Sequence, residues 1–279
     1  MTGLFAAIRR NAQPSRRRVA IGVTQLTPEL MYNLWKANEF AEIITVGKEV
    51  PGFGSKPEKD ERSSADRLVA LAKNREVDAI IRGQLYYTYY HESMKRHFGF
   101  KRDVMCPSLL RDACGNEWFI TPVVHTDDVS IDGRCYLATQ AARICAKLGV
   151  DPVIGVLAAD NERGYSEVVD RSLDDAEAIV LRLKAQGYND CAMYALQINK
   201  AAEKCNIVIP MDGIVGNFVC RSLAYLGGAT LVGGFSLTPR FVSLDTSRCG
   251  DQFHPAIETT VAMCNLGGMP VDEYSSESS

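Results

Sequence analysis

The chain has 279 residues, of which 46% are hydrophobic and 23% are charged, and its formal net charge is -3. These values are typical of a folded protein with one large domain or two ordinary ones, and they exclude a disordered or collagen-like chain. The negative charge argues against a nucleic-acid-binding surface over the whole molecule. No apolar run reaches the roughly 20 residues of a membrane helix, and none follows the N-terminal arginines as in a signal peptide. We therefore expect a cytoplasmic protein that binds neither nucleic acid nor membrane.

Strand-like and helix-like segments alternate along the chain. The first predicted helix has Thr27 as its cap and Pro28 in its first position, both of which favour a helix start. The first half predicts strands at 18–23, 41–45, 77–83 and 117–124, helices at 28–40, 63–74 and 131–148, and a polar, aromatic stretch over 86–111. The second half predicts strands at 152–159, 206–210 and 229–235, helices that end near 186 and 226, and a last helix at 255–266.

This alternation predicts an α/β fold with a mainly parallel sheet. In such folds, ligands bind beyond the carboxyl ends of the strands. The polar residues that directly follow each apolar run are therefore where we expect a functional site.

Four loops that follow predicted strands carry the candidate site residues. Each loop taken alone can be a turn or a helix cap, because Gly, Asp, Asn and Ser serve those roles. Together they favour an anion such as phosphate, because Arg82, Arg163 and Arg248 stand at strand ends, with helix N-termini nearby. The same loops contain Gly83, Asn161, Asp212, Gly216, Asn217, Asp245, Ser247 and Asp251.

The cysteines and histidines show no metal-site spacing. No two of the nine cysteines form a Cys-x-x-Cys pair, and their odd number favours free thiols. His91 and His97 are predicted surface residues, and the tyrosine run at 85–91 favours a packed, partly exposed helix face over the wall of a ligand cleft. The first strand–helix junction lacks a Walker or Rossmann motif. We therefore expect no metal, no nucleotide site and no tightly bound cofactor.

The last third of the chain resembles the phosphate acetyl/butyryl transferase family. The resemblance rests on PMDGIVGNFVCRSLAYLGGATLVGG, with a Gly-Asn pair at a helix start, and FVSLDTSRCGDQFHPAIETTVAMC, with a Ser-Arg pair before the last helix. VDAIIRGQ and PVIGVLAADNERG extend it over about residues 77 to 267. Within that family, FITPVVHTDD, VVDRSLDD, DGIVGN and FVSLDTSR are similar to the MtxX-type methanogenesis marker proteins, which are methyltransferase-related.

The resemblance implies a fold and an assembly. The fold is two α/β domains with mainly parallel sheets and an interdomain cleft, of the isocitrate/isopropylmalate dehydrogenase-like type found in phosphotransacetylases. The implied N-terminal domain is residues 1–130 completed by 250–279, and the second domain is residues 131–249. The family usually forms a homodimer, which we expect here.

The resemblance also implies site residues. Ser247 and Arg248 match the pair that binds phosphate or acyl phosphate in the family. The other matches are Gly216 with Asn217, in its Gly-Asn loop, and Arg82 with Gly83, where the N-terminal domain meets the ligand.

Acyl transfer in this family joins an acyl phosphate to coenzyme A, which is the co-substrate we expect. The thiolate attacks the carbonyl, so the protein must bind phosphate, stabilise the oxyanion and hold the thiol. Arg248 would neutralise the phosphate, and Ser247 would donate to the oxyanion. Asp245 or Asp251 would accept the thiol proton.

Two departures from the family pattern keep other functions open. MYALQINKA stands where the family has an Asp-Gly-Pro segment, and the aspartate expected several residues after the Ser-Arg pair is out of register. These differences concern coenzyme A binding and thiol activation. The alternatives are transfer of another group, such as methyl, and a non-catalytic binding or assembly protein that keeps the fold.

Overall fold

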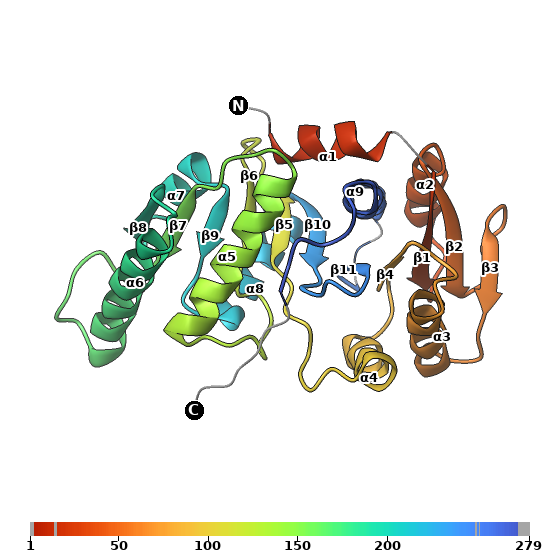
Figure 1. The fold of residues 1–279 in the computed structure, drawn as a ribbon, viewed down its shortest axis with the longest axis horizontal. Coiled ribbons are helices and arrows are strands. Elements are labelled where there is room, and N and C mark those ends of the chain that lie inside the picture. The colour runs from red at the N-terminus through yellow and green to blue at the C-terminus, as the bar shows by residue number, and fades with distance from the viewer. Residues whose placement is uncertain (1–2, 14–15, 249, 251, 273–279) are drawn as a thin grey trace. The chain divides into compact units, whose positions relative to one another are not determined.

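The computed structural model describes residues 3–13, 16–248, 250 and 252–272 (Figure 1). The chain forms two compact units. The discontinuous unit is residues 6–104 together with 232–269, and the central unit is residues 105–231 together with the two ends of the chain. Each unit is described by itself.

The discontinuous unit is built on a mainly parallel sheet. Its strands are β1 (Arg17–Val23), β2 (Ala41–Gly47), β3 (Gly54–Pro57), β4 (Ala79–Ile81), β10 (Thr230–Phe235) and β11 (Val242–Asp245). They follow the order β3-β2-β1-β4-β11-β10, in which β10 alone is antiparallel to its neighbour β11. The carboxyl ends of β4 and β11 therefore meet at one edge of the sheet.

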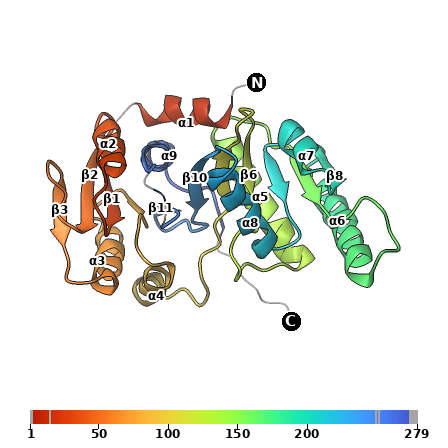
Figure 2. The same cartoon turned by 180° about the vertical axis from the view of Figure 1, so that it is seen from behind.

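Helices cover both faces of this sheet. The helices are α2 (Pro28–Ala37), α3 (Glu61–Lys73), α4 (Tyr87–Phe98) and α9 (His254–Asn265). Figures 1 and 2 show α2 and α9 on one face and α3 and α4 on the other. The α3–α4 face has a core of apolar residues that includes Leu68, Ile80 and Met94, and Tyr90 is fully buried among them.

The central unit repeats this architecture. Its strands are β5 (Ser108–Arg111), β6 (Glu117–Ile120), β7 (Ile154–Leu157), β8 (Cys191–Ala195) and β9 (Ile207–Ile209), in the order β5-β6-β9-β7-β8. Only β5 is antiparallel. Its helices are α5 (Ile131–Lys147) and α6 (Glu167–Ala185), side by side on one face, and α7 (Ile198–Lys204) and α8 (Gly213–Tyr225), packed on the core around Trp118 and Val208.

Local sequence signals account for several helix starts. The predicted cap of α2 is confirmed, because the Thr27 hydroxyl accepts a hydrogen bond from the Leu30 N–H and Pro28 begins the helix. Asp60 caps α3 through a capping box with Ser63. Ser166 caps α6 in the same way that Thr27 caps α2. The predicted α/β class with mainly parallel strands is confirmed.

Some elements differ from the prediction. The strand predicted at 117–124 ends at Ile120, two residues before Pro122, which has no N–H group to donate to a sheet. The stretch 86–111, predicted only as polar and aromatic, contains α4 and β5. The short helix α1 (Leu4–Ala12) also lies outside the predicted elements.

The boundaries of the compact units lie elsewhere than those of the predicted domains. They fall at 104/105 and 231/232, where the prediction has 130/131 and 249/250. Strand pairing gives the reason. The β5–β6 hairpin joins the central sheet through β9, and the β10–β11 hairpin joins the other sheet through β4. No helix in the described part of the chain is long and apolar enough to cross a membrane.

Candidate functional site at the ends of β4 and β11

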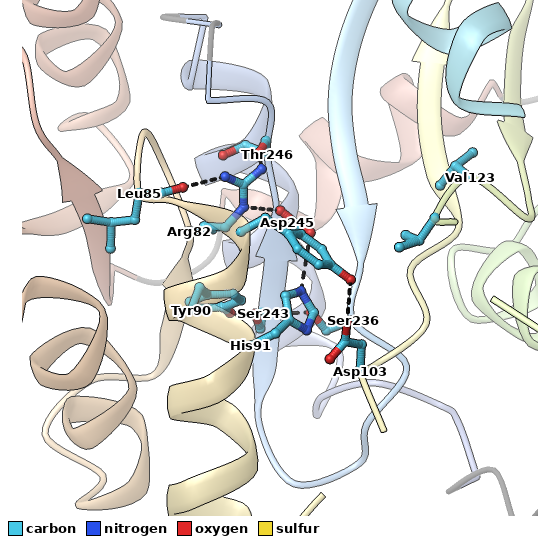
Figure 3. Close-up of polar contacts among 12 residues, drawn as sticks. Arg82, Leu85, Tyr90, His91, Asp103, Val123, Ser236, Ser243, Asp245 and Thr246 are labelled. Atoms are coloured by element: carbon cyan, nitrogen blue, oxygen red, sulfur yellow. Dashed lines mark hydrogen bonds and ion pairs between the residues drawn. The ribbon is translucent and has the colours of Figure 1, made fainter. Parts of the chain in front are cut away.

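A buried ion pair joins the two turns that follow β4 and β11 (Figure 3). The Arg82 guanidinium donates from Nε to the Asp245 carboxylate and from Nη2 to the Thr246 carbonyl, and Nη1 donates to the Leu85 carbonyl at 2.5 Å. The Thr246 hydroxyl donates to the Gly83 carbonyl at 3.1 Å. Arg82, predicted as a ligand residue, is thus occupied within its own unit in holding the two turns together.

The same ion pair sets the charge of Asp245. Burial by itself raises the pKa of this carboxyl, but the Arg82 guanidinium and His91 outweigh it and hold the pKa at about 2. The carboxylate is therefore ionised at neutral pH. It is also a weak base for a thiol, because an ordinary thiol has a pKa of roughly 8.5.

Gly83 is required by the backbone. Its φ is +64°, and a Cβ at this position would lie 1.9 Å from the Gly22 carbonyl oxygen. Only glycine accommodates both the left-handed conformation and the close approach of β1.

Arg248 stands at the start of α4. Its guanidinium lies 4.1 Å from the centroid of the Tyr86 ring, and Nη2 lies 2.8 Å from a Glu61 carboxylate oxygen. The Arg248 side chain remains 42% exposed. Tyr86 is the N-cap residue of α4, and no side chain caps the helix there. An exposed cation thus lies beside the N–H groups of a first helical turn, an arrangement that attracts anions.

Ser247 precedes Arg248 in the same turn and is half-buried. Asp251, predicted as a catalytic residue, lies outside the described residues. The structure therefore gives no position for its carboxylate.

The remaining predicted residues belong to the central unit, and two of them lie in the loop after β7. Arg163 pairs with Asp174 and Glu177 of α6, at 2.9 Å from the Glu177 carboxylate. Asn161 accepts a hydrogen bond from the Gln197 amide at 3.2 Å. Both residues are exposed and form surface contacts within this unit.

Three more predicted site residues follow β9, at the start of α8. Asp212 caps α8 by accepting from the Val215 N–H at 2.7 Å. A Cβ on Gly216 would lie 2.0 Å from the Pro122 carbonyl oxygen, and the Asn217 amide donates to the Val123 carbonyl at 3.0 Å. These residues pack the start of α8 against the turn that follows β6.

His91 lies beside Asp245 and is not among the predicted site residues. The prediction that it is a surface residue is wrong: it is 3% exposed, and its Nε2 lies 3.5 Å from Asp245. The available signal was the tyrosines on either side, since Tyr87 and Tyr90 both pack against its ring in α4. The prediction that this tyrosine run packs as a partly exposed helix face is confirmed for Tyr90, which is fully buried, while Tyr86 is 47% exposed.

In the ranges that the structure describes, no three His, Cys, Asp or Glu side chains are arranged to hold a metal ion. No disulfide joins any two of the eight described cysteines. Burial raises the pKa of the Cys145 and Cys220 thiols to about 12, which makes them unreactive at neutral pH.

The amino-acid sequence is 33% identical over 273 residues to the protein named "Putative methyltransferase mtx subunit X" from Methanosarcina mazei. The alignment covers 95% of this chain and 97% of the relative. The chain belongs to the mtx subunit X family. No family model matches the chain. The 33% identity to the Methanosarcina mazei protein confirms the relationship to MtxX-type proteins that the sequence motifs predict.

Solved structures place the fold of this mtx subunit X family member among the phosphotransacylases. A branched-chain phosphotransacylase from Enterococcus faecalis V583 superposes with a TM-score of 0.64 at 17% identity, over 90% of this chain and 99% of that one. The EutD phosphotransacetylase from Staphylococcus aureus gives 0.63 at 11% identity, over 94% and 98%. The predicted phosphotransacetylase-like fold is confirmed.

Proposed function

We propose that the chain binds a phosphate or acyl-phosphate group at Ser247 and Arg248 and catalyses acyl transfer. The observation that carries the proposal is the position of Arg248, exposed and stacked on Tyr86 at the uncapped start of α4. Among the described residues its one hydrogen-bond partner is Glu61, through Nη2. The other N–H groups of the guanidinium fork can therefore face a phosphate oxygen.

The phosphotransacylase-like fold supports this chemistry, and coenzyme A is the proposed acceptor. Its thiolate sulfur attacks the acyl carbonyl carbon, the carbon–oxygen bond to phosphate breaks, and phosphate leaves with the electron pair. Arg248 would balance the charge on the phosphate, and Ser247 would donate to the carbonyl oxygen. The thiol proton needs a better base than Asp245, because the pKa of Asp245 is about 2. Asp251 therefore remains the proposed acceptor.

We propose that the site is supported by contacts inside the protein, made by Arg82, Gly83 and Asp245. They hold the turns that carry Tyr86 and Arg248. A ligand role for the predicted residues of the central unit would require each of them to give up its present contacts in favour of the ligand. These residues are Asn161, Arg163, Asp212, Gly216 and Asn217.

Methyl transfer is the second candidate. It is favoured by the name of the Methanosarcina relatives, which are called methyltransferase subunits. A non-catalytic assembly role is the third, and a stable complex with another protein would favour it. We further propose a homodimer in the cytoplasm. A sedimentation measurement that gives twice the 30.7 kDa chain mass would support the dimer.

Thermal shift with four ligands tests these candidates. Ligands that bind only the native state raise the melting temperature. Phosphate, acetyl phosphate and coenzyme A should each stabilise the wild type, and Arg248→Ala should lose the first two effects. S-adenosylmethionine as the only active ligand would favour methyl transfer instead. No response to any of the four would overturn the proposed site.

Arg62 offers a matched control. Its guanidinium lies 4.5 Å from the Tyr89 ring centroid and 2.7 Å from Glu92, so it reproduces the setting of Arg248 away from the end of β11. Both ion pairs are exposed, and each is worth at most about 1 kcal/mol of stability. Arg62→Ala should therefore keep the response to phosphate and acetyl phosphate.

A further inference from the structure

A buried histidine faces the Asp245 carboxylate from the side opposite to Arg82 (Figure 3). The His91 Nε2 atom lies 3.5 Å from Oδ2 of Asp245, while Arg82 contacts Oδ1. This is ion-pair distance but not hydrogen-bond geometry, and neither ring nitrogen of His91 has a hydrogen-bond partner within the described residues. A fully buried imidazole with unsatisfied nitrogens needs an explanation.

Aromatic neighbours fix the orientation of the His91 ring. The Tyr87 ring lies over it at a centroid distance of 4.1 Å, and the Tyr90 ring meets it edge-on at 5.4 Å. Each tyrosine is itself held, Tyr87 by a hydrogen bond to Asp103 at 3.0 Å and Tyr90 by contact with the Ser243 hydroxyl at 2.5 Å. The imidazole therefore keeps Nε2 directed at Asp245.

Two ion pairs surround the His91 ring. Asp245 faces it from β11 and Asp103 from the segment after α4, while Arg82 and Lys95 pair with these two carboxylates. Each carboxylate that faces His91 therefore has a cation of its own.

We propose that His91 is a positioning residue for the anion site, which holds Asp245 and through it the turn that carries Ser247 and Arg248. The inference rests on the proposed function. Arg82 contacts both Asp245 and the Thr246 carbonyl, and Ser247 and Arg248 are the next two residues. A shift of the Asp245 carboxylate therefore moves the backbone that presents Arg248.

Two substitutions separate the contact from the bulk of the side chain. Glutamine places its amide nitrogen where histidine has Nε2, so His91→Gln retains a donor that reaches Asp245. Asparagine places its amide nitrogen at the position of Nδ1, so His91→Asn loses that donor. His97→Gln is the matched control, because His97 lies on the same helix and has its own carboxylate partner, Asp66, at 3.0 Å.

Calorimetric titration with sulfate, as a mimic of phosphate, is the first measurement. His91→Gln should bind sulfate within about twofold of the wild type. His91→Asn should bind about tenfold more weakly, the size of effect expected when a polar contact to a charged group is lost. His97→Gln should behave as the wild type.

Hydrogen exchange of the ligand-free protein gives a readout independent of binding. The backbone amides of residues 244–248 should exchange faster in His91→Asn than in the wild type or His91→Gln. Circular dichroism identifies a variant that has unfolded. If His91→Asn unfolds, His91→Gln decides the question, because the proposal requires it to match the wild type both in sulfate affinity and in the exchange of residues 244–248.

The outcomes distinguish this inference from the proposed function. If sulfate binds in an Arg248-dependent way but His91→Asn changes neither affinity nor exchange, the positioning role is wrong and the anion site stands. If sulfate does not bind the wild type while exchange responds as described, the proposed function is wrong, and His91 holds the turn at residues 244–248 without serving an anion site. Equal behaviour of the Gln and Asn variants contradicts the positioning role.

Discussion

Arg82 and Asp245 form a buried ion pair between residues that are 163 positions apart in the chain. Each member stands at the carboxyl end of a strand, and the strands are β4 and its parallel neighbour β11. The side chain of Arg82 is 8% exposed and that of Asp245 is 10% exposed. The charge of each residue is therefore compensated by the other and not by water.

Removal of Arg82 should destabilise the protein strongly. Arg82→Ala leaves the Asp245 carboxylate buried without its main cation, and the expected loss is about 3–5 kcal/mol in the free energy of unfolding, measured with urea. Arg62→Ala, which breaks an exposed pair, should cost at most about 1 kcal/mol. Similar losses in the two variants would show that the buried pair is not a structural element.

Gly216 should not tolerate even one added methyl group. A Cβ there would lie 2.0 Å from the Pro122 carbonyl oxygen, so Gly216→Ala must displace α8 or the turn after β6. We expect a loss of more than about 2 kcal/mol in unfolding free energy, at the upper end of overpacking effects.

Gly54→Ala is the control for that substitution. The nearest atom to its added Cβ is a backbone oxygen at 3.8 Å, an ordinary contact distance. Its unfolding free energy should stay within about 1 kcal/mol of the wild type. If Gly216→Ala is equally stable, the packing between α8 and residues 121–124 is looser than described.

His254 should make the protein less stable in mild acid. Burial lowers the pKa of this imidazole to about 4, and Lys36 and Arg9 add to the effect. The unfolded chain takes up the proton at about pH 6.5, whereas the folded protein does so only near pH 4. The stability contributed by neutral His254 is therefore complete above pH 6.5 and decreases as the pH falls toward 4.

Urea unfolding between pH 7.5 and pH 4 measures this effect. His254→Gln has no proton to take up and should show a smaller loss of stability over that range. His97→Gln, at a half-buried position on α4, should retain the decrease seen in the wild type. An unchanged pH profile in His254→Gln would mean that other groups account for the acid sensitivity.

The strands and helix caps could be predicted from sequence because their causes are local. Residues 19–23 form an apolar run that is buried in β1, and Thr27 caps α2 through an atom three residues away. The stretch 86–111 could not be assigned in this way. Its helix α4 buries Tyr90 and His91, two residues with polar groups, against partners on β11 that no local pattern reveals.

The candidate site shows the same limit. A strand-end arginine such as Arg82 looks like a ligand residue when its partner cannot be seen, and that partner lies on a distant strand. Arg248 was predicted at a strand end beside a helix N-terminus, and the structure places it at the start of α4. Its stacking on Tyr86 was not predicted, because the strand order that brings β11 next to β4 is a property of the whole sheet.

The division of the discontinuous unit between residues 6–104 and residues 232–269 also constrains how the protein is made. During synthesis, residues 6–104 leave the ribosome without β11 and α9, and Arg82 has no carboxylate to meet until Asp245 has been translated. The strands of the central unit, which lie within 105–231, are complete earlier, so this unit can assemble first. Until β11 is made, the sheet formed by residues 6–104 has β4 as an unpaired edge strand. Unpaired edge strands promote the aggregation of newly made chains. Because β11 closes this edge, the edge stays open until the last sixth of the chain has been made.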